Sequence, residues 1–317
     1  MRKKAIVMTA FLIILVGCGT KDTRNIIEYQ FREGTKGLEM QLLQNSPPPK
    51  VYENSDILIS AEISNLGAYD IENSYLALGI EDEYMEVRDW NGYIIKEKGT
   101  GSKRNTFGIQ GKSQLMPEGQ KSAITIRAKT RTLEQQTETH TSVVALTACY
   151  KYKTILEQEV CIDPDVYNLR NEKKVCTVTP ISLSSQGAPV AVVKIEPLML
   201  DSEDSQQARP QFMIYIRNVG NGEVYSQSIM EDACGSSAIS KDNINMVSIK
   251  ANVAGRGLQC TPQQVHLKDK EGIVKCSMEQ GVSKAGNAFS SPLVVEIDYG
   301  YSFTVSRSVE IRRLGRQ

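Results

Sequence analysis

The sequence predicts an all-β protein made of two antiparallel β-sandwiches in tandem. Three observations support this prediction: apolar residues alternate with a period of two in many short segments, no segment above ten residues has sustained helical spacing, and the two halves carry matching motifs. The chain has 317 residues, enough for two hydrophobic cores at about 150 residues per domain.

The alternation is clearest at 57–63, where isoleucine or alanine occupies every second position. This pattern is typical of a strand with one buried face. By the same criterion we expect strands at 38–43, 57–63, 75–80, 123–128, 143–152, 156–162, 190–195, 212–217, 246–252, 265–268, 293–301 and 304–312.

Two pairs of segments indicate an internal duplication. Residues 60–71 (SAEISNLGAYDI) match 213–224 (MIYIRNVGNGEV), and both contain a strand followed by Asn-x-Gly. Residues 143–152 (VVALTACYKY) match 294–301 (VVEIDYGY), and we expect each to be followed by a hairpin and a return strand. The halves should meet at a Ser/Gly/Pro-rich linker, 180–189.

The N-terminus has the layout of an export signal. A basic start (Arg2, Lys3 and Lys4) precedes an apolar stretch at 5–16. Twelve helical residues extend about 18 Å, well short of a bilayer core of about 30 Å, which favours a signal peptide over a membrane span. The following Gly17-Cys18 completes a sequence, LVGC, that resembles the lipobox of prokaryotic lipoproteins.

That resemblance implies cleavage before Cys18 and a covalent lipid on this cysteine. The protein would then be lipid-anchored in the cell membrane and face the extracytoplasmic side, at the cell surface or in the periplasm. The expected organisation is a signal peptide at 1–17, a membrane tether at 18–34, a first sandwich domain at 35–179, the linker at 180–189 and a second domain at 190–317.

Export makes disulfides the expected state of the other six cysteines: Cys149, Cys161, Cys176, Cys234, Cys260 and Cys276. Cys260 and Cys276 should face each other on strands that flank a turn at 268–270. Each half holds three cysteines, so either one bridge crosses between the halves or one thiol stays free. Zinc is the alternative, although the chain has no CxxC pair and no histidine near the first three cysteines.

A second resemblance concerns the fold. Asn65-x-Gly67 ends one expected strand, and the turn at 115–120 (LMPEGQ) opens another. These motifs resemble the CARDB-like (cell-adhesion-related) Ig-like domains of bacterial and archaeal surface proteins, although here Glu118 precedes Gly119. The resemblance implies two tandem Ig-like β-sandwich domains at a cell surface and supplies no catalytic residues.

Few residues offer chemistry. Positive and negative side chains number 37 each, so no net charge attracts nucleic acid. We expect His140 in a solvated loop before a strand and His266 on the polar face of a strand, both structural. The acidic segments 81–83 and 201–204 are possible calcium loops, but neither has calcium-loop spacing and both are expected to be solvated.

One aromatic pair is a possible contact site. Asn91-Gly92 predicts a two-residue hairpin turn flanked by Trp90 and Tyr93. These rings would either stack on a sugar or partner protein, or pair with each other across the hairpin.

We therefore expect a non-catalytic lipoprotein without a cofactor, which offers an adhesion-type binding or scaffolding surface to an unknown envelope protein or glycan. The alternatives are a carbohydrate-binding accessory module and, less favoured, an envelope enzyme or metal protein that uses its cysteines.

Overall fold

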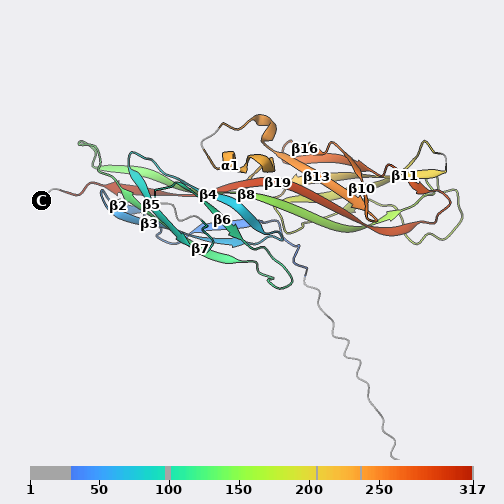
Figure 1. Cartoon of the computed structure of the whole chain (residues 1–317), viewed down its shortest axis with the longest axis horizontal. Coiled ribbons are helices and arrows are strands. Elements are labelled where there is room, and N and C mark those ends of the chain that lie inside the picture. The colour runs from blue at the N-terminus through green and yellow to red at the C-terminus, as the bar shows by residue number, and fades with distance from the viewer. Residues whose placement is uncertain (1–29, 97–100, 205, 236–237, 316–317) are drawn as a thin grey trace, which may run out of the picture.

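The computed structural model describes residues 30–96, 101–204, 206–235 and 238–315, and it confirms an all-β protein with antiparallel sheets. Three sheets form an elongated molecule (Figure 1). One continuous cluster of buried apolar residues runs through both halves. The expected signal peptide and Cys18 lie outside the described residues.

Each end of the molecule contains one smaller sheet. The four-stranded sheet has the order β1 (Leu38–Leu42), β3 (Asp56–Asn65), β7 (Lys121–Thr130) and β5 (Met85–Gly92). The six-stranded sheet has the order β15 (Gln259–Thr261), β17 (Glu271–Ser277), β11 (Gln207–Asn218), β10 (Val190–Asp201) and β9 (Ile181–Ser182), with β18 (Val282–Ser283) also beside β11.

The nine-stranded sheet extends along the whole molecule. Its order is β14 (Arg256–Gly257), β13 (Met246–Val253), β19 (Phe289–Arg312), β8 (Thr139–Ile162), β4 (Ile71–Gly79) and β6 (Arg104–Ile109). Three short strands complete it: β12 (Glu223–Tyr225), β16 (Gln264–His266) and β2 (Lys50–Tyr52). The helical segments are η1 (Gln227–Ile229), α1 (Met230–Ala233) and η2 (Lys241–Asn243).

Strands β8 and β19 are the main departure from expectation. Each is 24 residues long, and they pair antiparallel along their whole length. The hairpins expected after 152 and after 301 are therefore wrong, because each predicted pair of strands is one continuous strand. No proline interrupts either segment at the expected turn. Gly300 stays in the strand, where an added Cβ would lie 2.3 Å from Cε of Met230.

The expected linker, 180–189, does not separate two independent sets of strands. β9 lies inside that range and pairs with β10. The C-terminal end of β19 pairs in parallel with β2. The last strand of the chain therefore completes the sheet at the end of the molecule that holds the first half. The two halves therefore share the nine-stranded sheet.

The matching sequence motifs make matching contacts where β8 and β19 cross the middle of the molecule, which we call the waist. In the first half, the Tyr152 hydroxyl lies 3.4 Å from Oδ1 of Asn65. In the second half, the Tyr301 hydroxyl lies 3.4 Å from Oδ1 of Asn218. Each asparagine also accepts a hydrogen bond from the N–H two residues later. These equivalent contacts are what a duplication predicts.

Burial raises the pKa of the tyrosines at the waist. Desolvation raises the pKa of Tyr301 to about 12, and it raises the pKa of Tyr150 and Tyr299 well above the ordinary value. The Tyr150 hydroxyl accepts from Leu38 N–H, and the Tyr299 hydroxyl accepts from Val190 N–H. The tyrosine hydroxyls thereby satisfy backbone donors where each half begins.

Candidate functional site

All six cysteines after Cys18 form disulfides. The bridges are Cys149–Cys234, Cys161–Cys176 and Cys260–Cys276. The predicted Cys260–Cys276 pairing is confirmed, since the two residues lie opposite each other on β15 and β17. The Cys149–Cys234 bridge joins the two halves, which was one of the two alternatives left open.

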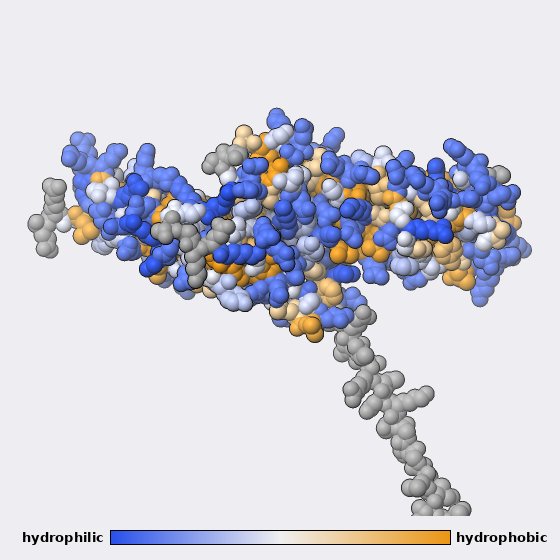
Figure 2. Space-filling model, viewed as in Figure 1, coloured by the Kyte–Doolittle hydropathy of each residue, from blue (hydrophilic) through white to orange (hydrophobic). Residues whose placement is uncertain are grey.

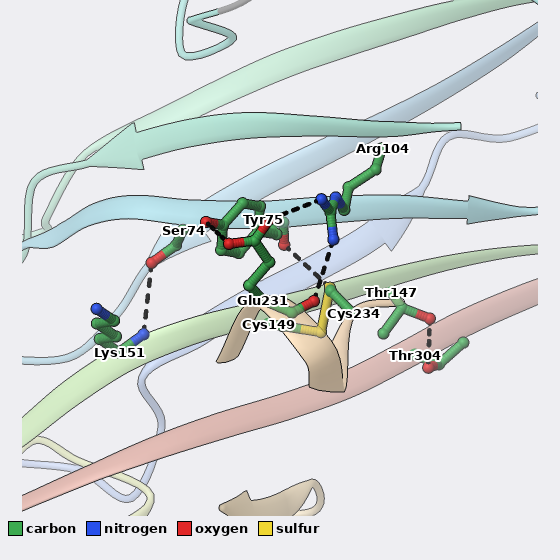
Figure 3. The surroundings of a disulfide bond; sticks show 9 residues. All are labelled: Ser74, Tyr75, Arg104, Thr147, Cys149, Lys151, Glu231, Cys234 and Thr304. Carbon is green, nitrogen blue, oxygen red and sulfur yellow. Dashed lines mark hydrogen bonds and ion pairs between the residues drawn. A yellow bond between two sulfur atoms is a disulfide. The ribbon is translucent and has the colours of Figure 1, made fainter. Parts of the chain in front are cut away.

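The bridge between the halves fixes a short helical insert, formed by η1 and α1, to the waist. Figure 3 shows Cys149 on β8 bonded to Cys234 directly after α1. Beside it, the guanidinium of Arg104 lies 2.9 Å from the Glu231 carboxylate and 5.1 Å from the ring centre of Tyr75. A disulfide, an ion pair and a cation–π contact therefore hold the second-half insert against first-half strands.

The expected Trp90–Tyr93 hairpin is wrong. Asn91 and Gly92 lie within β5 and pair with β7. Glycine fits closely against β7 at this position, since an added Cβ on Gly92 would lie only 2.9 Å from Cγ2 of Ile124. Trp90 is buried, with 3% exposure, and its Nε1–H donates to Ser102 O at 2.7 Å. It therefore cannot stack on a partner, whereas Tyr93 is 89% exposed.

His140 also departs from expectation because it lies on β8 rather than in a loop. Its ring stacks on Tyr84 with centroids 3.6 Å apart, and its Nε2 lies 2.9 Å from Glu81. The hydrogen bond from His140, together with one from Ser142, lowers the pKa of Glu81. His266 is exposed on β16, as predicted.

Two carboxylates of the acidic segments pair with lysines of this chain. Beyond the contact of Glu81 with His140, Asp82 pairs with Lys103, and Asp201 pairs with Lys284. In the described ranges, no group of three or more His, Cys, Asp or Glu side chains is placed to hold a metal ion.

A loop closed by the Cys161–Cys176 disulfide lies at the end of the second half, and we call residues 163–176 the tip loop. Within it, the Asp165 carboxylate accepts hydrogen bonds from the N–H groups of Leu169 and Arg170, at 3.0 and 2.9 Å. These bonds hold the pKa of Asp165 below its ordinary value. Nζ of Lys174 lies 2.6 Å from Asp163 and 3.5 Å from Asp165.

The tip loop is also attached to its neighbours. The Tyr167 hydroxyl donates to the Asp201 carboxylate, and Nη1 of Arg170 donates to Gly286 O at 2.9 Å. Despite this attachment, three apolar side chains face solvent: Tyr167 (67% exposed), Leu169 (82%) and Val175 (78%).

The tip loop is the surface that sequence reasoning missed. The available signal was the pair Cys161 and Cys176, which enclose fourteen residues that include a tyrosine and a leucine. Their exposure was not predictable, since alternation does not say which side chains in an irregular loop face solvent.

Among the described residues, no helix is both long and apolar enough to span a membrane. Comparison of the chain with protein-family models and with curated proteins gave no match.

Proposed function

We propose that the protein is a non-catalytic lipoprotein, anchored in the cell membrane by a lipid on Cys18 and facing the extracytoplasmic side. Its role is to offer a rigid, adhesion-type binding or scaffolding surface to another component of the envelope. The observation that carries this proposal is the pairing of all six remaining cysteines in disulfides. Disulfides persist in exported proteins and are rare in the cytosol.

The attachment of the N-terminal segment supports this role. Gly34 N–H donates to the Ser185 hydroxyl at 3.1 Å, and Gly187 N–H donates to Gly34 O at 2.9 Å. The described chain thus begins at the waist, between the two ends (Figure 1). Cys18 is twelve residues from Gln30, which limits their separation to about 40 Å. Such an anchor leaves both ends available to partners.

The tip loop supports the same role. Its apolar side chains sit on a backbone already held by a disulfide and by hydrogen bonds to Asp165. A preorganised loop loses little conformational freedom on binding, which favours affinity. The alternative of a carbohydrate-binding module loses one of its two expected aromatic rings, because Trp90 is buried whereas Tyr93 is exposed.

The test is the intact mass of the protein from its native membrane, measured with and without reduction before alkylation. We expect a chain that starts at lipid-modified Cys18 and takes up six alkyl groups only after reduction. An unprocessed chain with freely alkylated thiols would overturn the proposal and favour a metal protein.

A further inference from the structure

We propose that the tip loop and the acidic hollow beside it bind a folded protein partner that has an apolar pocket with a basic rim. This inference rests on the proposed function, because it requires an extracytoplasmic partner, and it specifies the surface used and the chemistry of the partner.

The apolar part of the surface stands on a backbone that is held at several points. Tyr167, Leu169 and Val175 lie on one disulfide-closed loop, and each is more than half exposed. The face shown in Figure 2 is mostly hydrophilic, with hydrophobic residues in separate patches. A fixed backbone lowers the entropy cost of binding, and tyrosine is enriched among the residues that dominate binding energy.

The charges of the tip loop do not determine the partner, because several of them are already used within the protein. Lys174 pairs with Asp163 and Asp165, while Arg170 binds the Gly286 carbonyl. The loop therefore contributes mainly apolar contacts.

The neighbouring hollow supplies the charge. It has a volume of about 1070 Å³. Its walls include Ile162, which directly precedes the tip loop, and Ser202, which follows Asp201, the residue that Tyr167 of the tip loop contacts. Its charged wall residues are Glu203, Asp204, Glu279 and Arg256, an excess of two negative charges. A partner with lysine or arginine around an apolar pocket complements this surface.

The same charge argues against a bilayer as the partner. Anionic lipid would repel the acidic hollow, and the described chain begins at the waist rather than at the end that holds the β10–β11 connection (Figure 1). A lipid contact is therefore an outcome that the experiment must be able to detect.

The experiment places the photo-crosslinker p-benzoylphenylalanine at Leu169 of the full chain, in its native membrane. The matched control places it at Leu58, an apolar residue on β3 that is 51% exposed. We expect a discrete protein adduct at Leu169 and none at Leu58. Sequencing of the adduct should locate it on a partner segment with an apolar residue near lysine or arginine.

The identified partner segment then serves as the binding probe. Tyr167→Ser should weaken binding about tenfold or more, the effect of truncating a binding hot spot. The double variant Glu203→Gln, Asp204→Asn should weaken binding and reduce its dependence on salt. Thermal unfolding and closed disulfides verify that each variant is folded.

Three outcomes would overturn the inference: equal adducts at Leu169 and Leu58, adducts with the mass of lipid alone, or binding that both variants leave unchanged. The intact mass separates this failure from failure of the proposed function. A chain lipidated at Cys18 without a specific Leu169 adduct contradicts only the assignment of the tip surface, whereas an unprocessed chain with free thiols contradicts both.

Discussion

The disulfide between the halves should contribute more to stability than either local disulfide. Cys149 and Cys234 are 85 positions apart, whereas the local pairs are 15 and 16 positions apart. In the loop-entropy model, closing the longer loop stabilises the fold by about 4 kcal/mol, compared with about 3 kcal/mol for a local loop. The value of about 4 kcal/mol already allows for the Cys161–Cys176 bridge, which lies within the longer loop and shortens it. We therefore expect Cys149→Ala with Cys234→Ala to cost about 4 kcal/mol.

The matched control is Cys260→Ala with Cys276→Ala, which removes a buried local bridge and should cost about 3 kcal/mol. Guanidinium unfolding measured by circular dichroism and by fluorescence gives both values. Trp90 is the single tryptophan and lies in the first half, so its fluorescence reports on that half. Because β8 and β19 serve both halves, the two probes should give coincident transitions in the unmodified protein.

The reasoning would be refuted if the variant lacking the Cys149–Cys234 bridge lost no more free energy of unfolding than the control. Such a result would mean that residual structure already restricts the long loop in the unfolded ensemble, so that the disulfide removes little further entropy.

Three further predictions concern single side chains. Trp90→Ala should cost about 3–5 kcal/mol in thermal unfolding, as for other buried aromatics, whereas Tyr93→Ala should be nearly neutral; equal effects would contradict the burial of Trp90. Gly67→Ala should cost about 3 kcal/mol or more, because its Cβ would lie 1.9 Å from the Tyr152 hydroxyl, whereas Gly257→Ala meets no atom within 4 Å; equal melting temperatures would refute this. Asp165 has its pKa lowered from 3.8 by hydrogen bonds from Arg170 and Leu169, so its contribution is present above pH 3.8 and is lost as the pH falls through the lower folded-state pKa. Asp165→Asn should reduce that acid-induced loss of stability, measured by thermal unfolding against pH, and an unchanged pH profile would contradict the assignment.

The sequence by itself determined the features that depend on near neighbours. The alternation at 57–63 predicted β3, because a strand with one buried face needs an apolar residue at every second position. Cys260 and Cys276 were predictable as a pair because short flanking strands place them opposite each other. The repeated Asn-x-Gly and Tyr-x-Tyr motifs indicated equivalent positions, which the matching hydrogen bonds of Asn65 and Asn218 support.

Only the tertiary structure decided which segments continue and which side chains reach the surface. Asn91-Gly92 is a turn signal, but pairing with β7 keeps it extended and places Trp90 in the core. The continuity of β8 and β19 depends on each strand having the other as a partner over 24 residues. The Cys149–Cys234 pairing likewise depends on where α1 packs against the shared sheet. Strand pairing and burial are set by segments far apart in the chain, so local patterns do not specify them.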